Sequence, residues 1–245
     1  MRYLAIVSYK GTSFCGWQKQ TTSKLPSVEV TIEKVISRIL NKETKIYGSG
    51  RTDAGVHALG QAFHFDSQKE LDKTRFMHSL NELLPPDIRI LSIKSVADDF
   101  HARFNAKSKS YIYKIKNAKV SSPFKSDLEY TLGQDLNIEK MVEAAKLFEG
   151  KHNFQNFTSK EEDDAGFARD LYHIFITKEN DDIIISMNGS GFMRYMVRMI
   201  VGTLIQVGLG KLTSEDIKKI LEDPVRKPSS YKAPAYGLYL KEVLY

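Results

Sequence analysis

The sequence contains little cysteine, and its apolar residues form no long uninterrupted run. Among 245 residues there is one cysteine, Cys15, which excludes a disulfide framework and is typical of a reducing compartment. The most apolar stretch, 196–209, includes an arginine, a glycine and a glutamine, so it does not predict a membrane span. Residues 1–7 are too short for a signal peptide and lack its cleavage region. We therefore expect a cytoplasmic protein that contacts no membrane.

Familiar cofactor and metal motifs are also absent around the most glycine-rich stretch, 48–58. The order of its glycines breaks the dinucleotide pattern G-x-G-x-x-G, and no Gly-Lys-Ser/Thr of a phosphate loop follows. His57 and His64 could suggest a metal, but neither cysteine nor carboxylates accompany them at a ligand spacing. We expect no metal.

The composition is that of a folded protein with one large or two small domains. Hydrophobic residues make up 42% of the chain and aromatic residues 11%, which excludes a disordered polypeptide. A formal net charge of +6 favours a polyanionic partner without identifying one.

The stretch 48–58, Gly-Ser-Gly-Arg-Thr-Asp-Ala-Gly-Val-His-Ala, combines a tight backbone with two opposite charges. Three glycines indicate a sharp turn or a close approach, and Arg51 and Asp53 stand two residues apart. A carboxylate presented on such a turn can serve a ligand. The alternative is structural, because aspartate in a glycine-rich turn commonly bonds its own backbone and an arginine beside it is an ordinary surface charge. The local pattern leaves both readings open and favours the structural one.

The positive charge is concentrated between residues 101 and 119. This segment has no acidic residue, and Phe104, Tyr111 and Tyr113 lie among its basic side chains. Basic residues interleaved with aromatics suit phosphate contacts and base stacking in nucleic-acid binding. A solvated strand with its usual lysines explains the pattern equally well. The basic residues are Arg103, Lys107, Lys109, Lys114, Lys116 and Lys119.

Hydrophobic periodicity predicts two similar α+β halves, 1–106 and 107–245. The first reads β-α-β-β-α-β, the order of the ferredoxin-like split βαβ unit, and the second repeats that order without evident sequence identity. We expect strands at 2–10, 45–47, 61–66, 88–96, 110–116, 170–177, 182–188 and 238–244. We expect helices at 27–40 with Ser27 as its cap, 74–84, 138–148, 192–207 and 214–221 with Ser214 as its cap.

The long helix expected at 192–207 supplies a second candidate residue. Its apolar residues cover most of its circumference, so it should be buried, yet Arg194 and Arg198 stand four residues apart on one face. A buried guanidinium needs an anionic partner, and Asp53 is the candidate. The alternatives are a structural salt bridge from Arg198 to another acid, and an Arg194 side chain that reaches solvent.

Several short motifs follow one another along nearly the whole chain, and together they resemble the tRNA pseudouridine synthase A (TruA) family. The stretch 50–58 corresponds to the family's signature around a catalytic aspartate. The other matches are Gly16–Trp17–Gln18, Asn81-x-Leu83–Leu84–Pro85-x-Asp87–Ile88, Phe100–His101–Ala102–Arg103–Phe104, Tyr111-x-Tyr113, Gly191–Phe192–Met193, Met196–Val197–Arg198, Gly202–Thr203–Leu204 and Ala233–Pro234–Ala235-x-Gly237–Leu238.

The resemblance implies a pseudouridine synthase fold with a central basic cleft, generally in a homodimer. It implies cofactor-free isomerisation of uridine to pseudouridine at positions 38, 39 and 40 of the tRNA anticodon stem-loop. Asp53 would be the catalytic carboxylate, Arg198 its buried partner, and Tyr111 the residue that packs on the target base and helps to deprotonate C5. Arg51 would fill the space left by the flipped nucleotide. We also expect substrate contacts from His57, Arg103, Lys107 and Lys109.

The chain departs from the family pattern at three places. Lys10 stands where the family usually has aspartate, Asn153 replaces another aspartate, and Met199 replaces asparagine. None changes Asp53, so we expect activity, with altered supporting hydrogen bonds. The competing hypotheses are a catalytically silent RNA-binding module on the same fold, and a phosphate-ester hydrolase, which would need a metal site that the sequence does not offer.

Overall fold

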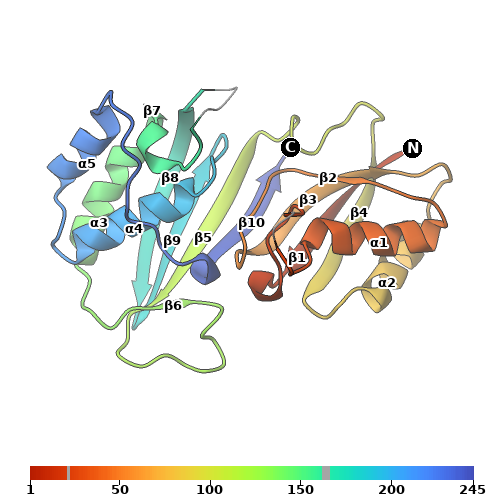
Figure 1. Ribbon diagram of the computed structural model, residues 1–245, viewed down its shortest axis with the longest axis horizontal. Coiled ribbons are helices and arrows are strands. Elements are labelled where there is room, and N and C mark those ends of the chain that lie inside the picture. Colours follow the sequence, from red (N-terminus) through yellow and green to blue (C-terminus); the bar gives the residue numbers. More distant parts are fainter. Residues whose placement is uncertain (21–22, 162–165) are drawn as a thin grey trace. The chain divides into compact units, whose positions relative to one another are not determined.

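The computed structural model describes residues 1–20, 23–161 and 166–245 and divides into two compact units (Figure 1). The first unit comprises Met1–Lys107 and Tyr239–Tyr245, and the second comprises Ser108–Leu238. The sequence-based division assigned everything after residue 106 to the C-terminal half. In the structure, residues 239–245 group with the N-terminal part of the chain, because their strand pairs in parallel with a strand of the first unit through Tyr239 and Leu240.

The first unit contains the expected split βαβ arrangement, so the prediction of an α+β fold is confirmed. Strand β1 pairs antiparallel with both β3 and β4, β2 pairs antiparallel with β3, and β10 lies parallel to β3. The elements are β1 (Arg2–Tyr9), the 3-10 turn η1 (Gly11–Ser13), α1 (Val28–Leu40), β2 (Ile46–Gly48), β3 (His57–Asp66), α2 (Lys73–Leu83), β4 (Ile88–Val96) and β10 (Leu238–Leu244).

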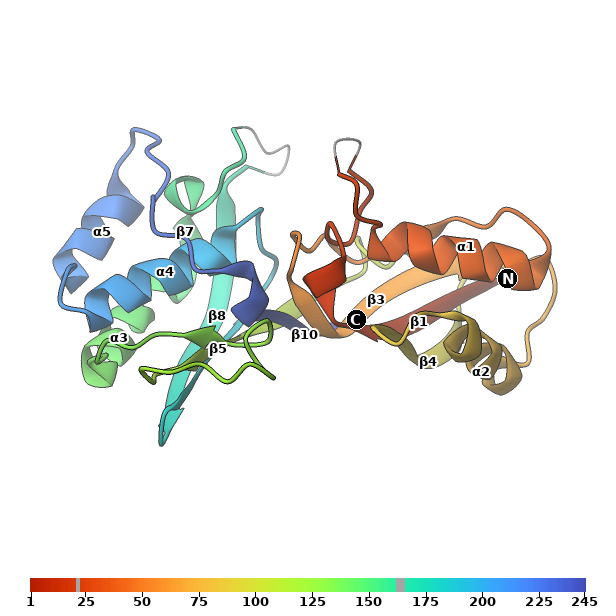
Figure 2. The same cartoon turned by 60° about the horizontal axis from the view of Figure 1, so that its bottom comes forward.

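The two helices of the first unit begin at side-chain caps and bury apolar faces. Ser27 Oγ accepts a hydrogen bond from Val30 N, as the sequence predicted, and the Asp72 carboxylate caps α2 in the same way. The helices pack against each other and against the sheet (Figure 2), where Phe76 stacks on Phe65 with ring centroids 5.8 Å apart. This core supports β3, the strand that follows the glycine-rich stretch.

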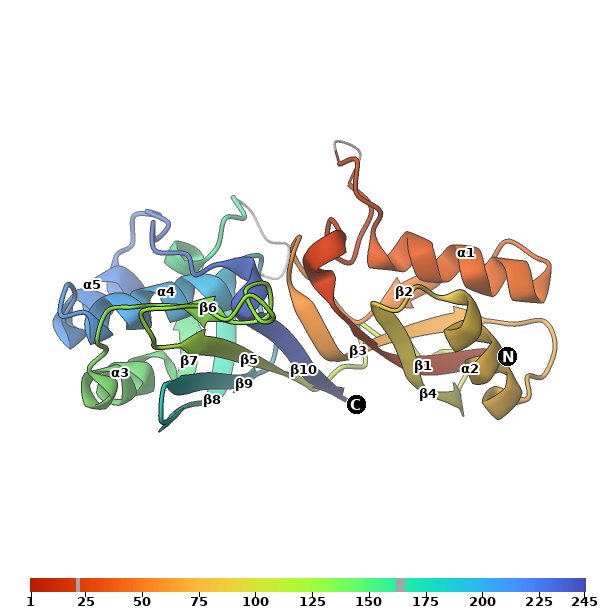
Figure 3. The same cartoon turned by 90° about the horizontal axis from the view of Figure 1, so that it is seen from below.

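The second unit is built on an antiparallel sheet with strand order β5-β9-β8-β7, and β6 pairs in parallel with β5. Helices α3, α4 and α5 pack together beside these strands (Figure 3). The elements are β5 (Ser108–Lys116), β6 (Tyr130–Thr131), α3 (Ile138–Ala145), β7 (Gly150–Asn153), β8 (Ala168–Glu179), β9 (Asp182–Gly189), α4 (Met196–Gly208) and α5 (Ser214–Glu222). Short 3-10 turns lie at Lys146–Phe148, Gln155–Phe157 and Ala235–Gly237.

The long helix begins later than the sequence predicted. Helix α4 begins at Met196 instead of residue 192, because Tyr195 adopts a left-handed backbone with φ of 64°. Arg194 therefore precedes the helix, and the expectation that it shares a helical face with Arg198 is wrong.

Smaller differences concern element ends. Strand β3 begins at His57 instead of Gln61, because its ladder with β1 extends back to the pair Tyr9–Ala58. Helix α5 is capped by Thr213 instead of Ser214, in a reciprocal arrangement with Asp216. The two- and four-residue strands β6 and β7 were not predicted, since so few residues show no periodicity.

In the part of the chain that the structure describes, the helices are too short or too polar to cross a lipid bilayer.

Candidate active site

The candidate catalytic residue Asp53 lies on the loop between β2 and β3, and the first residues of the loop are hydrogen-bonded to β3. Ser49 N donates to Ala62 O over 2.7 Å, and Ser49 Oγ donates to Gln61 Oε1 over 2.6 Å. The Gln61 amide in turn donates to Gly50 O over 2.8 Å. On the C-terminal side of the loop, the Asp53 carbonyl accepts a hydrogen bond from Val56 N over 3.1 Å, which closes a turn. The backbone on both sides of the carboxylate is therefore fixed.

A second layer of contacts reaches the same loop from residues 9–17. Trp17 N donates to Thr52 O over 3.1 Å, and the Tyr9 hydroxyl lies 2.8 Å from Thr52 Oγ1. The approach is close enough to require glycine at two positions. A Cβ at Gly16 would overlap the Thr52 carbonyl oxygen, and a Cβ at Gly11 would overlap the Val56 carbonyl oxygen. The loop is thus held between β3 and the segment that follows β1.

The single tryptophan, Trp17, belongs to this support and is buried in the core. Trp17 is 1% exposed, and a Cβ at Gly48 would come within 2.5 Å of its indole nitrogen. The Glu29 carboxylate accepts a hydrogen bond from Trp17, and burial, followed by the charge of Glu33, raises the pKa of Glu29. The positive charge of Arg51 lowers the pKa of Glu29. The exposed Arg51 therefore interacts electrostatically with this half-buried carboxylate.

His57, expected to contact substrate, is 1% exposed in the structure and begins β3. Its Nδ1 accepts a hydrogen bond from Gly11 N over 3.0 Å, and its ring stacks on Tyr239 of β10 with centroids 4.6 Å apart. The histidine connects the end of the Asp53 loop to two other elements of the first unit. His57 is therefore part of the structure that supports the Asp53 loop.

The segment 100–107 carries Arg103 and Lys107, and both side chains are exposed. The Arg103 guanidinium lies 5.7 Å from the ring centroid of Phe104, whose ring is 75% exposed. The segment is anchored to β10 and to the residue that follows it, since Lys107 N donates to Leu244 O over 2.8 Å and the Tyr245 hydroxyl donates to Ala102 O over 2.8 Å. These contacts leave a cation and an aromatic ring on the surface.

His101 of this segment lies against His64 of β3. His64 is 1% exposed, its ring centroid is 4.7 Å from that of His101, and its Nδ1 accepts from Ala102 N over 3.1 Å. Burial, and then the charges of His101 and Arg2, lower the pKa of His64 to about 4 from an ordinary 6.5. Burial also lowers the pKa of His101.

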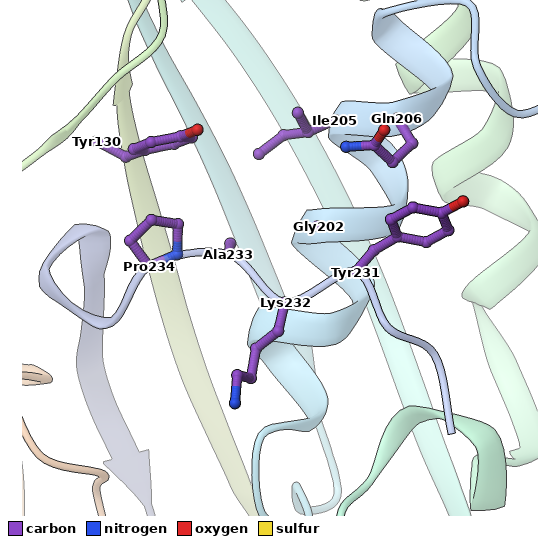
Figure 4. Close-up of a pocket in the computed structure, with 8 residues that line it drawn as sticks. All are labelled: Tyr130, Gly202, Ile205, Gln206, Tyr231, Lys232, Ala233 and Pro234. Carbon is purple, nitrogen blue, oxygen red and sulfur yellow. The ribbon is translucent and has the colours of Figure 1, made fainter. Parts of the chain in front are cut away.

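In the second unit, Arg198 lies in the first turn of α4. Its Nε donates to Ala233 O over 2.8 Å, and Ala233 N donates to Arg198 O over 3.0 Å. This contact depends on Gly202, where a Cβ would lie 2.6 Å from Tyr231 O. Beside it is a pocket of about 90 Å³, lined by Tyr130, Gly202, Ile205, Gln206, Tyr231, Lys232, Ala233 and Pro234 (Figure 4).

Tyr111 and Lys109 lie on β5 of the second unit. Tyr111 is 9% exposed and meets Phe192 edge to face, with centroids 5.0 Å apart. The neighbouring Tyr113 is fully buried, and its hydroxyl donates to Pro234 O over 2.9 Å. Burial raises the pKa of Tyr113, which keeps its hydroxyl protonated.

The candidate residues therefore form two groups. Asp53, Arg51, His57, Arg103 and Lys107 belong to the first unit, whereas Lys109, Tyr111 and Arg198 belong to the second. Chemically, the first unit offers a carboxylate on a fixed loop and the second offers a guanidinium and a phenol on regular elements. Among residues 1–20, 23–161 and 166–245, there is no group of three or more His, Cys, Asp or Glu side chains placed to hold a metal ion.

Sequence reasoning missed the residues that surround Arg198. The apolar spacing predicts Tyr195 inside a helix and gives no indication of Lys232. The apolar pattern there indicates neither a left-handed residue nor a contact between positions 37 apart, such as that of Lys232 with Tyr195. The signal was present in the glycine at position 202, since a glycine in a buried helix indicates that another backbone approaches it closely.

Comparison with known proteins places the chain in a family. A family model described as tRNA pseudouridine synthase matches residues 5–105 and 144–245. The tRNA pseudouridine synthase A 2 of Clostridium tetani (strain Massachusetts / E88) is 41% identical over 239 residues, which cover 98% of this chain and 96% of that protein. The protein of the same name from Bacillus anthracis is 40% identical, with 98% of each chain covered. The tRNA pseudouridine synthase A of Staphylococcus aureus (strain MRSA252) is 37% identical over 99% of this chain and 91% of that protein.

Both parts of the family match contain candidate residues described above, since Asp53 and Arg51 lie in the first part and Arg198 in the second. This agreement and the near-complete overlap with its relatives show that the chain belongs to the tRNA pseudouridine synthase family and is an isomerase.

Proposed function

We propose that this enzyme converts uridine to pseudouridine in the anticodon stem-loop of tRNA, at positions 38, 39 and 40, with Asp53 as the catalytic carboxylate. The observation that carries the proposal is the fixed loop around Asp53. Hydrogen bonds to Ser49 and Gly50 tie the loop to β3, and Trp17 N holds Thr52 O on the other side. A carboxylate that must meet one atom of a ribose or a base has to be held in this way.

The reaction requires no other participant. The N1–C1′ bond of uridine breaks, the ring turns, C5 bonds to C1′, and the proton leaves C5 while N1 gains one. A carboxylate can act covalently in this sequence, on the sugar or on the base. The carboxyl group of free aspartate has a pKa of ~3.9, which suits a nucleophile that must be ionised at neutral pH. The isomerisation involves no net oxidation, so we propose that the enzyme works without a cofactor.

Each remaining site residue has a proposed role. Arg198 pairs with Asp53 and fixes its rotamer, and the hydrogen bond from its Nε to Ala233 O supports this by limiting its own rotation. Tyr111 packs on the flipped uracil and helps to remove the C5 proton, while the exposed Arg51 occupies the space that the base leaves. His57 acts through the loop that it supports. Arg103, Lys107 and Lys109 contact phosphates.

We further propose that the enzyme is a cytoplasmic homodimer that binds tRNA. The basic segment 101–119 supports the tRNA assignment, because its six cations have no acidic neighbour in sequence. The oligomeric state is tested by light scattering with and without tRNA. A monomer under both conditions contradicts the homodimer without affecting the catalytic assignment.

The decisive experiment incubates the enzyme with unmodified tRNA and maps pseudouridine along it. We expect product at positions 38, 39 and 40 with the wild type and none with Asp53→Ala, which should lose turnover by at least about 1,000-fold. Because Asp53→Ala keeps the cations, it should bind tRNA almost as the wild type does. Product at other uridines contradicts the anticodon assignment, turnover by Asp53→Ala contradicts the role of Asp53, and no product with the wild type leaves the silent RNA-binding alternative.

A further inference from the structure

Tyr195 is held in a backbone conformation that residues with side chains rarely adopt. Its φ is 64°, in the left-handed region, where a bulky residue is uncommon. Its neighbours hold it there, since Thr158 Oγ1 donates to Arg194 O over 3.0 Å and Met199 N donates to Tyr195 O over 2.9 Å. Such residues persist where the surrounding structure fixes them, and they are concentrated at binding sites.

Three cations surround the Tyr195 ring. The guanidinium carbons of Arg194 and Arg198 lie 4.8 Å and 5.3 Å from its centroid, and Lys232 Nζ lies 4.3 Å from it. Arg194 also donates to the Tyr195 hydroxyl over 3.1 Å. Each cation is attracted to the face of the ring, but three like charges around one ring repel one another.

Two of these cations, Arg194 and Lys232, have exposed side chains. Across the described ranges, no salt bridge joins Arg194 or Lys232 to a carboxylate, and both residues are exposed. An anion between them would offset the repulsion. A phosphodiester suits this place, since guanidinium binds two of its oxygens in parallel and the lysine adds a point charge.

The support of this cluster is rigid. Lys232 precedes Ala233, which exchanges hydrogen bonds with Arg198, and the close approach of Tyr231 O to Gly202 holds the same segment against α4. Figure 4 shows the Lys232 side chain extending away from Tyr130, Ile205 and Gln206, and its ammonium nitrogen lies close to the Tyr195 ring. The backbone that carries Lys232 is therefore held against α4.

We propose that Arg194 and Lys232, arranged around the ring of Tyr195, form a binding site for a backbone phosphodiester of the tRNA. Tyr195 is a positioning residue, because it acts on the phosphate through the two cations. The proposal rests on the function above, in which Asp53 neutralises Arg198 and leaves the other two cations for the RNA. It assigns a ligand to residues that the catalytic proposal does not use.

The first test measures the affinity for unmodified tRNA over a series of salt concentrations. Arg194→Ala and Lys232→Ala should each weaken binding and reduce the slope of log K against log salt by about 1, because one phosphate contact is lost. The matched control is Lys178→Ala, which removes an exposed lysine of β8 in the same unit. Slopes equal to that of the control overturn the phosphate site.

The second test separates the ring from the charges. Tyr195→Asn keeps a residue that tolerates the left-handed backbone but removes the ring, whereas Tyr195→Phe keeps the ring. We expect Tyr195→Asn to weaken tRNA binding and flatten its salt dependence although no charge is removed, and Tyr195→Phe to bind close to the wild type. Thermal unfolding of both variants verifies that they fold. Wild-type binding by Tyr195→Asn overturns the positioning role.

These measurements do not depend on turnover. The absence of pseudouridine from every tRNA treated with wild-type enzyme contradicts the proposed function, and the salt slopes still report on the phosphate site. Normal product with unchanged slopes contradicts the phosphate site alone.

Discussion

The two units hold their proposed site residues by different physical means. Around Asp53, main-chain segments contact each other directly, and there is no room for a side chain at Gly11 or Gly16. Around Arg198, three cations lie close to the ring of Tyr195, and the main contact with the backbone is the hydrogen bond to Ala233 O. The position of the carboxylate therefore depends on close packing of the main chain, which a single methyl group can disturb. The positions of the cations depend on side chains, which can be changed one at a time.

The largest effect should follow a methyl group added under the Asp53 loop. Gly11→Ala places a Cβ against the Val56 carbonyl oxygen, where only backbone can move. We expect a loss of about 3 kcal/mol in the free energy of unfolding, together with a large fall in kcat as the loop shifts. Urea unfolding and single-turnover kinetics measure the two effects.

A glycine with open surroundings supplies the control for that substitution. Gly191→Ala adds a methyl group that meets nothing within 4 Å, so its free energy of unfolding should change by less than about 0.5 kcal/mol. Equal losses in Gly11→Ala and Gly191→Ala would contradict the close packing described here.

A smaller effect should follow the corresponding change in the second unit. Gly202→Ala brings a Cβ to 2.6 Å from Tyr231 O and pushes residues 231–233 away from α4. We expect a loss of about 2 kcal/mol in the free energy of unfolding. The hydrogen bonds between Arg198 and Ala233 should weaken, and with them the placement of Lys232, so both kcat and tRNA affinity should fall. A variant that lost stability alone would show that this segment does not position the cations.

The smallest effect should appear in the pH dependence of stability and should be traceable to the first unit. Since folding lowers the pKa of His64 to about 4 from 6.5, the unfolded chain binds more protons between these values. The contribution is complete above pH 6.5 and is lost as the pH falls toward 4; between pH 7 and pH 5 the loss is on the order of 1 kcal/mol.

Unfolding by urea at pH 7 and pH 5 measures this dependence. His64→Gln should flatten it, whereas the control His78→Gln changes an exposed histidine of α2 and should leave it as it is. A dependence that survives in His64→Gln would have to come from other groups, such as His101.

How much could be predicted from the sequence depended on whether a signal was local. The cap at Ser27 and the apolar spacing after it predicted α1, and the structure confirms both. The start of α4 was wrong because Phe192 and Met193 continue the apolar pattern, whereas the left-handed backbone at Tyr195 leaves no trace in hydrophobic periodicity.

The candidate site followed the same rule. Asp53 could be singled out because glycines and opposite charges lie within a few residues of it. The contacts that hold its loop come from Gly11, Gly16 and Trp17, which are distant in sequence, and only the folded chain brings them together. The roles of Asp53, Tyr111 and Arg198 were supplied by the family resemblance and stay predictions.

The pairing of β10 with β3 has a consequence for the order of events during synthesis. Residues 239–245 complete the first unit, and they supply the ring that stacks on His57 and the carbonyl that accepts from Lys107 N. Although the first 107 residues emerge from the ribosome early, the unit that carries Asp53 stays short of its last strand until the entire second unit has been translated. A chain whose synthesis ends anywhere between residues 108 and 238 would therefore contain the carboxylate, but the loop that carries it would be only partly supported.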